Sequence, residues 1–186
     1  MGSVPIFYGA REFRQSAIVR TAIALGSNLG DRLAHLRTAQ REILKLENVG
    51  SPLIASRIYE TEPVGTGTDA GAFLNAVIEV EFDGEADALL AELQAIEAKL
   101  GRPARHPRNA SRTIDLDILY IGDRVLHCED IAIPHPRLHL RRFVLAPLAD
   151  VCPRAILPGQ VKCVADLLAE LRDPAAVTLF ASQWAE

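Results

Sequence analysis

Residues 112–121 constrain the fold of this chain most, because they predict a single β-strand with two unlike faces. The segment is rich in β-branched and aromatic residues, which favour strands, and side chains along a strand alternate between its faces. Apolar residues at every second position predict a buried face: Ile114, Leu116, Ile118 and Tyr120. Asp115 and Asp117 share the opposite face, roughly 6.5 Å apart along the chain at about 3.3 Å per residue.

Two carboxylates on one strand face repel each other unless water, basic groups or a cation lies beside them. Oxygen ligands at this spacing suit Mg²⁺, which is often bound by one or two carboxylates together with substrate phosphates. The plainer interpretation is a strand with a solvated outer face. Arg112 and the basic residues that precede it favour the metal and phosphate interpretation.

The length of 186 residues, with 49% hydrophobic and 24% charged residues, predicts a single globular domain. We expect it to span residues 20–186, after a mobile N-terminal tail over residues 1–19 that shows no periodicity. No apolar run approaches about 20 residues, so no membrane-spanning helix is expected. Three cysteines without metal-ligand spacing favour a cytoplasmic location.

The distribution of charge is more informative than its sum. The net charge of −4 argues against general affinity for nucleic acid. The basic residues nevertheless gather in two clusters, one of Arg102, Arg105, His106, Arg108 and Arg112 and one of Arg137, His139, Arg141 and Arg142. Two basic clusters beside a carboxylate pair predict a compact polyanion that binds together with a metal ion.

Hydrophobic periodicity predicts further elements around this strand. Strands are expected over residues 21–25, 52–60 and 73–82, a short hairpin return at 125–126, and helices from about 31 to 47, over 85–100 and over 164–171. The turn at residues 26–31 predicts either a phosphate cradle or a tight strand-to-helix turn capped by Ser27, Asn28 or Asp31. The absence of a P-loop lysine and the glycine spacing favour the turn.

Two other segments carry residue types suited to ligand binding. Phe73 and Asn75 lie on one strand face, where an aromatic plane beside an amide can stack on a flat heterocycle and hydrogen-bond to it. An edge aromatic and a turn asparagine are the plainer interpretation. Residues 102–111 contain two prolines and several cations, which predicts either a solvated basic loop or arginines that close over phosphates.

The chain resembles the 6-hydroxymethyl-7,8-dihydropterin pyrophosphokinase family (HPPK) from about Thr21 to Leu171. The strongest motif is Arg-Thr-Ile-Asp-Leu-Asp-Ile-Leu at 112–119. Supporting motifs follow in a matching order: Ala-Leu-Gly-Ser-Asn-Leu-Gly at 24–30, Tyr-Glu-Thr-Glu-Pro-Val-Gly at 59–65, Phe-Leu-Asn-Ala at 73–76, Ile-Pro-His-Pro-Arg at 133–137 and Arg-Arg-Phe at 141–143. Each motif alone is weak, and their order and spacing make the resemblance specific.

The resemblance implies an α+β, ferredoxin-like fold with an antiparallel sheet and helices packed on it. It implies transfer of pyrophosphate from ATP to the pterin hydroxymethyl group in folate biosynthesis, with release of AMP. By position, Asp115 and Asp117 would hold two Mg²⁺ ions, and Arg102 and Arg112 would join them as catalytic residues. The ATP contacts would be Glu97, Arg102, Arg112, His135 and Arg141. The pterin contacts would be Thr61, Val64, Phe73, Asn75 and Phe143. The resemblance also implies a monomer that has only small-molecule partners, ATP and hydroxymethyl-dihydropterin, without nucleic acid or membrane.

Three positions depart from the family pattern. Asn109-Ala110-Ser111-Arg112 stands where members often carry Trp-Gly-Pro-Arg, so an aromatic that helps to seal the site is absent. A second loop arginine falls at Ala104, and Arg105 or Arg108 would replace it. Leu140 occupies a position that is often polar. We expect the 102–111 loop to be mobile without nucleotide and to close when both substrates bind.

Two other function classes share part of this pattern. Asp-x-Asp is also found in other metal-dependent phosphoryl enzymes, such as haloacid-dehalogenase-type phosphatases, where the first Asp is the nucleophile. That fold needs an early parallel strand, whereas this motif follows residue 110 and the strands predict an antiparallel sheet. The third class is a non-catalytic pterin- or nucleotide-binding module, which has no need for paired metal carboxylates.

Overall fold

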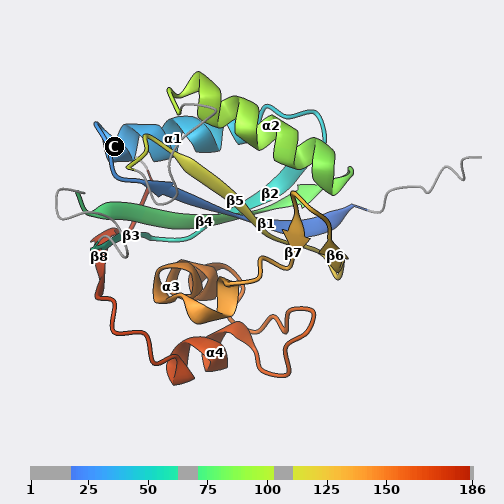
Figure 1. Cartoon of the computed structure of the whole chain (residues 1–186), viewed down its shortest axis with the longest axis vertical. Coiled ribbons are helices and arrows are strands. Elements are labelled where there is room, and N and C mark those ends of the chain that lie inside the picture. The colour runs from blue at the N-terminus through green and yellow to red at the C-terminus, as the bar shows by residue number, and fades with distance from the viewer. Residues whose placement is uncertain (1–17, 63–70, 103–110, 185–186) are drawn as a thin grey trace, which may run out of the picture.

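The computed structural model describes residues 18–62, 71–102 and 111–184, which form one antiparallel sheet between two layers of helices (Figure 1). The sheet has six strands in the order β5-β1-β4-β3-β8, with β2 also paired to β4. All these pairings are antiparallel. The strands are β1 (Val19–Ser27), β2 (Val49–Ala55), β3 (Ile58–Thr61), β4 (Phe73–Phe82), β5 (Asp115–Ile121) and β8 (Val177–Ala181).

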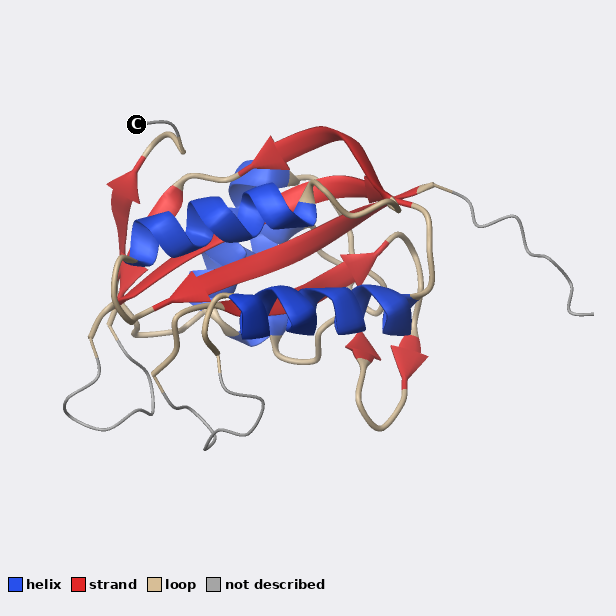
Figure 2. Ribbon diagram, turned by 90° about the horizontal axis from the view of Figure 1, so that it is seen from above, coloured by secondary structure: helices blue, strands red, loops and turns tan. Residues whose placement is uncertain are grey.

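Each face of the sheet carries one pair of helices (Figures 1 and 2). One face is covered by α1 (Arg32–Ile43) and α2 (Ala86–Lys99), and the other by α3 (Arg142–Val151) and α4 (Val164–Glu170). The order from β1 to β5 is that of a ferredoxin-like fold, to which α3, α4 and β8 are added. The predicted α+β class is therefore confirmed. No helix in the described parts of the chain is long and apolar enough to cross a membrane.

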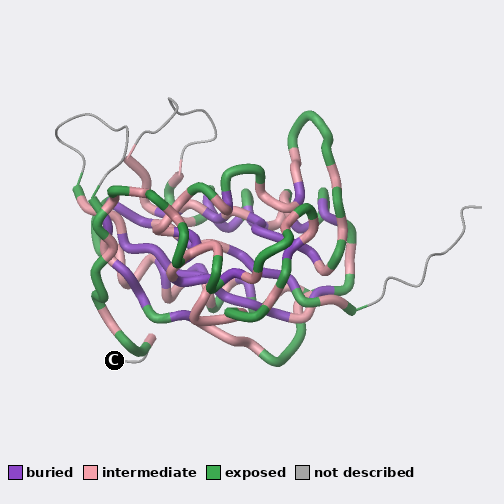
Figure 3. The backbone as a smooth tube through the Cα atoms, turned by 90° about the horizontal axis from the view of Figure 1, so that it is seen from below, coloured by how far each residue is buried: buried purple, intermediate pink, exposed green. Residues whose placement is uncertain are grey.

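Buried side chains form two hydrophobic clusters, one on each side of the sheet, and Figure 3 shows the buried residues running along the central strands. Apolar residues of α1 and α2 face the first cluster, where Leu36, Ala39 and Ile43 of α1 and Leu89 and Leu93 of α2 are fully buried. A second cluster packs α3 and α4 on the opposite face. The central strands are thus covered on both faces, which fixes them as a rigid base for the residues at their ends.

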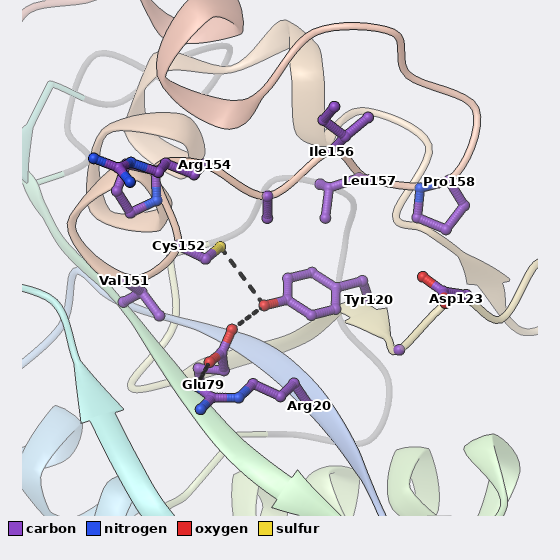
Figure 4. Close-up of a pocket in the computed structure, with 13 residues that line it drawn as sticks. Arg20, Glu79, Tyr120, Asp123, Val151, Cys152, Arg154, Ile156, Leu157 and Pro158 are labelled. Carbon is purple, nitrogen blue, oxygen red and sulfur yellow. Dashed lines mark hydrogen bonds and ion pairs between the residues drawn. The ribbon is translucent and has the colours of Figure 1, made fainter.

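Tyr120 does not share the buried face that its alternation predicted. The register between β1 and β5 shifts, because Ile23 pairs with Ile118 whereas Ala22 pairs with Tyr120. Leu119 is the extra residue of this β-bulge, and the alternation of faces is broken there. Tyr120 therefore belongs to the cluster beneath α3 and α4, where its hydroxyl donates a hydrogen bond to Glu79 (Figure 4).

Other predicted boundaries also change. The strand expected over residues 52–60 is two strands, because Ser56 pairs with Val77 through both its backbone N–H and its hydroxyl and interrupts the ladder. The return at 125–126 pairs as β6 (Leu126–His127) with β7 (Ala132–Ile133) and not with β5. β1 begins at Val19, and residues 1–17, which make up most of the predicted N-terminal tail, lie outside the described part of the chain.

Candidate active site

Gly26 of β1 lies at the floor of a cavity of about 400 Å³. Its backbone pairs with Asn75 of β4 on one side and with Asp115 of β5 on the other. A Cβ atom built at Gly26 would lie 3.4 Å from Asn75 Oδ1 and 3.8 Å from Asp115 Cβ. The glycine therefore leaves open the space in which an amide and a carboxylate from neighbouring strands face the same ligand.

Eight of the residues predicted for the site line this cavity together. They are Thr61, Phe73, Asn75, Arg112, Asp115, Asp117, Arg141 and Phe143. They come from β3, β4, β5 with the residues just before it, and the start of α3 with its N-cap, so four separate segments converge on one end of the sheet. The convergence follows from the antiparallel order, which brings the C-terminal end of β1 beside the N-terminal ends of β4 and β5.

The acidic end of the cavity holds the two carboxylates of β5. Arg102 Nη1 lies 2.6 Å from Asp115 Oδ1, and Arg112 Nη1 lies 3.3 Å from the same oxygen. Burial, together with repulsion from Asp115, raises the pKa of Asp117 to about 6, although the nearby arginines oppose this rise. A divalent cation between two such carboxylates would relieve both the burial of charge and the repulsion.

Glu97 lies behind this carboxylate pair, near the end of α2. Its Oε1 accepts a hydrogen bond of 2.7 Å from the backbone N–H of Leu116 and also forms an ion pair with Arg102. Burial raises the pKa of Glu97 to about 7. Neither Glu97 nor Arg102 is among the described residues of the cavity wall. Glu97 acts indirectly, because it orients Arg102, which in turn contacts Asp115.

The opposite end of the cavity is aromatic. Phe73 of β4 and Phe143 of α3 both line it, as do Asn75 and Thr61, and Asn75 Nδ2 donates a hydrogen bond of 2.8 Å to Thr61 Oγ1. The guanidinium carbon of Arg112 lies 5.7 Å from the centre of the Phe73 ring, and that of Arg141 lies 5.4 Å from the Phe143 ring. Two aromatic planes beside a fixed amide suit a flat heterocycle, and Arg112 contacts both the Phe73 ring and the Asp115 carboxylate.

His135 lies beside this cavity without being part of its described wall. Its backbone N–H donates to Leu119 O at 2.8 Å, and Nδ1 accepts from the backbone N–H of Arg137 at 3.2 Å. Burial, together with the charges of Arg141 and Arg137, lowers the pKa of His135 to about 4. The imidazole is thus neutral at neutral pH and can donate or accept a hydrogen bond.

This shift predicts a pH-dependent contribution to stability. The pKa of His135 falls from 6.5 to about 4 on folding, so between these values the unfolded chain binds more protons. The contribution is complete above pH 6.5 and is lost as the pH falls toward 4. Between pH 7 and pH 5 the wild type should lose up to about 2 kcal/mol more unfolding free energy than His135→Gln, an upper limit because the ring is partly exposed. Urea unfolding at both pH values measures this difference, and parallel losses would contradict it.

Asn28 supports the site from behind the cavity wall, a role that the sequence did not predict beyond a possible cap. Its Oδ1 accepts from the backbone N–H of Arg112 at 2.7 Å, its own N–H donates to Arg112 O, and Nδ2 donates to Ser111 Oγ at 3.0 Å. Asp31 is the cap of α1, through a 3.0 Å bond from the N–H of Ala34. The tight-turn interpretation is therefore confirmed, and the turn also anchors the residues that lead into β5.

Several predicted features cannot be placed. Val64, Arg105 and Arg108 lie outside the described residues, as does most of the predicted 102–111 loop. The described wall also includes Arg172, Asp173 and Pro174, which no sequence pattern singled out, and Gly26, Glu62 and Leu140, for which no ligand contact was predicted. Arg172 to Pro174 have no motif and lie about 60 positions beyond the Asp-x-Asp strand, so only the folded chain brings them to the site.

A second cavity, of about 470 Å³, lies beneath the β-bulge (Figure 4). Its buried Glu79 carboxylate is bound by Arg20 and by the hydroxyl of Tyr120, and burial raises the pKa of the Cys152 thiol to about 11. These polar groups satisfy one another. The first cavity, with its arginines and carboxylates directed at open space, therefore has the chemistry of an active site.

Comparison with known proteins decides the family of this chain. The family model of 7,8-dihydro-6-hydroxymethylpterin-pyrophosphokinase (HPPK) matches residues 22–153. The chain belongs to the HPPK family. It is a pyrophosphokinase of folate biosynthesis, which transfers the pyrophosphoryl group of its co-substrate ATP to the hydroxymethyl group of the dihydropterin. The resemblance, the fold and the reaction predicted from the sequence are confirmed.

Bacterial HPPK enzymes are similar along most of their length. The Bacillus subtilis enzyme is 44% identical over 130 residues, covering 70% of this chain and 76% of the relative. The Haemophilus influenzae enzyme is 34% identical over 162 residues, covering 87% of this chain and 99% of the relative.

A solved structure shows the same fold. The Plasmodium falciparum HPPK-DHPS chain, with pterin and p-hydroxybenzoate, aligns with a TM-score of 0.66 at 15% identity. The alignment covers 85% of this chain and 42% of that one, so this chain spans less than half of the Plasmodium protein.

Proposed function

We propose that Asp115 and Asp117 bind two Mg²⁺ ions and make this HPPK magnesium-dependent. Two carboxylates suffice for this donor set, because Mg²⁺ commonly takes the remaining oxygens from substrate phosphates and water. No cluster of three or more metal-ligating side chains occurs among the described residues, which is consistent with a site that substrate completes. When bound, the metal would neutralise phosphate charge and orient the β-phosphorus toward the attacking oxygen.

The basic residues around the pair are proposed to hold ATP. Arg112 and Arg141 face the cavity and can take phosphate oxygens through charge-assisted hydrogen bonds. Arg102 is held at Asp115 by Glu97, so its guanidinium is already directed at the carboxylate end. The neutral His135 is proposed as a hydrogen-bonding contact and not as a cation, because its lowered pKa keeps it uncharged.

The aromatic end is proposed to hold the pterin. Phe73 and Phe143 would stack on its ring, while Asn75 would bond to its edge and Thr61 would contact it through backbone groups. Val64 remains a predicted contact outside the described residues. Gly26 has no side chain to fill the space between Asn75 and Asp115. A pterin bound to Asn75 can therefore extend its hydroxymethyl group toward the arginines and carboxylates.

The site's residues then perform the transfer mainly by positioning and electrostatics. The hydroxymethyl oxygen forms a bond to the β-phosphorus of ATP, and the bond from that phosphorus to the α,β-bridging oxygen breaks, so AMP leaves. Arg102 and Arg112 stabilise the negative charge that spreads over the phosphoryl oxygens. The observation that carries this proposal is the pairing of Gly26 with both Asn75 and Asp115. This pairing places the proposed pterin contact and the proposed metal ligand side by side in one cavity.

Phe73→Ala and Phe143→Ala should each weaken pterin binding while leaving ATP affinity within about twofold. Stacking contributes about 0.5–1.5 kcal/mol beyond the buried area, so the dissociation constant should rise about threefold to tenfold or more. Calorimetric titration of each ligand measures the effect. Phe180→Ala, an aromatic truncation on β8 outside the cavity wall, is the matched control and should change neither affinity. Equal losses for both ligands would contradict the assignment.

We also propose a monomeric, cytoplasmic enzyme. Residues of one chain line both the aromatic and the carboxylate parts of the cavity, which supports a monomer. Sedimentation at working concentration tests this, and a stable dimer would contradict it. The location rests on the cysteine pattern alone.

A further inference from the structure

Residues Arg172, Asp173 and Pro174, in the segment between α4 and β8, form part of the wall of the active-site cavity. They lie beyond the region 22–153 that matches the family model. No role follows for them from the Asp-x-Asp strand or from the other motifs. Their contacts show what the segment does.

Asp173 binds the N-terminus of α3. Its Oδ2 accepts a hydrogen bond of 2.9 Å from the backbone N–H of Arg142, the first residue of that helix, and its Oδ1 accepts one of 3.0 Å from the N–H of Ala175. The residue at the N-cap of α3, Arg141, provides no side-chain cap. A carboxylate from a distant segment therefore satisfies a helix N–H that would otherwise lack a partner, where the helix dipole also favours negative charge.

Arg142 completes the attachment from the helix side. Its Nη2 donates to Leu171 O at 2.7 Å, and its Nε donates to Asp173 O at 3.3 Å. Burial alone would raise the pKa of Asp173, but the backbone hydrogen bonds from Arg142 and Ala175 outweigh it and leave the pKa below its usual value. The carboxylate is therefore ionised throughout the neutral range while it holds the helix.

The attachment fixes the two residues next to Arg142. Arg141 precedes it and Phe143 follows it, and both line the cavity. Three residues after Pro174, Val177 pairs with Thr61 of β3 on the other side of the cavity. The segment thus connects the helix that carries Phe143 with the strand that carries Thr61.

We infer that Asp173 is a positioning residue for pterin binding, which holds Phe143 and Arg141 in place by capping α3 from outside the helix. The inference rests on the proposed stacking of Phe143 on the pterin. Asp173 acts through the helix and is assigned no contact with the substrate.

The test compares the two ends of α3. Asp173→Ala removes the bonds at the N-terminal end. Asp150→Ala is the matched control, because Asp150 binds Arg57 and Tyr59 at the C-terminal end of the same helix, away from the cavity wall. Pterin affinity is measured by calorimetry with hydroxymethyl-dihydropterin, at a temperature where circular dichroism shows each variant to be folded, together with kcat and KM.

Asp173→Ala should raise the pterin dissociation constant about fivefold or more, the size expected from loss of a helix cap, and should raise KM for pterin more than it lowers kcat. Asp173→Asn keeps one acceptor oxygen and should show a smaller increase. Asp150→Ala should lower the melting temperature while pterin affinity stays within about twofold.

Two outcomes would overturn the inference: pterin affinity within twofold of wild type for Asp173→Ala, or an equal loss for Asp150→Ala, which would indicate general loosening of α3. Phe143→Ala separates this failure from failure of the proposed site. If Phe143→Ala weakens pterin binding and Asp173→Ala does not, the pterin site stands and the positioning role falls. If Phe143→Ala has no effect, the proposed pterin site itself is wrong.

Discussion

Asp115→Asn and Asp117→Asn should each lower turnover by about 10²-fold or more, the loss typical of removing one electrostatic stabiliser. Each substitution keeps the size of the side chain and removes a negative charge from the proposed metal site. The apolar face of β5 is untouched, since Leu116 and Ile118 pack on the other side of the strand. The fold should therefore survive.

The two variants should differ in stability. Asp117→Asn removes a buried carboxylate whose raised pKa shows that its charge is unfavourable in the free protein, so the unfolding free energy should stay the same or rise. Asp115→Asn removes the partner of Arg102 and Arg112 and should lower it. Asp117→Asn should thus lower turnover without lowering the unfolding free energy, as expected for a residue whose role is to bind a ligand.

Turnover measured across a Mg²⁺ titration checks the metal role. Asp123→Asn, in the exposed turn after the same strand, is the matched control and should behave as wild type. The metal assignment would be wrong if both site variants reached wild-type turnover at saturating Mg²⁺.

Arg102→Ala should reduce turnover on the order of 10²-fold and reduce ATP affinity much less. In the free protein Arg102 lies between Glu97 and Asp115, with 12% of its side chain exposed. Its removal leaves two carboxylates near each other without their shared cation and deprives the transferred phosphates of a guanidinium. If Arg102 meets phosphate mainly in the transition state, the loss appears in kcat.

Arg102→Lys separates charge from geometry. Lysine keeps the positive charge but lacks the planar fork that can bind Glu97 and a second oxygen at once, so it should restore only part of the activity. Steady-state kinetics and ATP titration of both variants measure the split. A loss of ATP affinity as large as the loss of turnover would show that Arg102 serves ground-state binding instead.

The sequence predicted which residues line the cavity better than it predicted where strands and helices begin, end or break. Alternation correctly separated Asp115 and Asp117 from Leu116 and Ile118, because a period of two fixes the faces of a regular strand. It failed at Tyr120, since a β-bulge depends on pairing with β1 that local sequence does not encode. The break at Ser56 has the same origin.

Helix α3 and strand β8 were not predicted. Pro147 lies inside α3, where it removes one backbone donor, and proline normally argues against a helix interior. Packing of Val144, Leu145 and Leu148 beneath the sheet outweighs that cost. β8 is short and its residues are mostly exposed, so it has no clear alternation, and its place beside β3 arises only from tertiary pairing.

Within the site, motif position located the residues that meet in the cavity, but not those that position them. Asn28 and Asp173 act through hydrogen bonds to the backbone of Arg112 and Arg142, far along the chain, which sequence spacing does not reveal. Glu97 was predicted as an ATP contact, but the spacing did not reveal its hydrogen bond to Leu116 or its ion pair with Arg102. The predicted closure of the 102–111 loop stays a prediction, because residues 103–110 lie outside the described part of the chain.

Product analysis tests the central claim most directly. The purified chain is incubated with ATP, Mg²⁺ and 6-hydroxymethyl-7,8-dihydropterin, and the nucleotides are separated by chromatography. Attack at the β-phosphorus moves two phosphates together, so AMP and the pterin diphosphate should form in equal amounts and only when all three components are present. ADP or free phosphate as the main product would contradict pyrophosphoryl transfer by this chain.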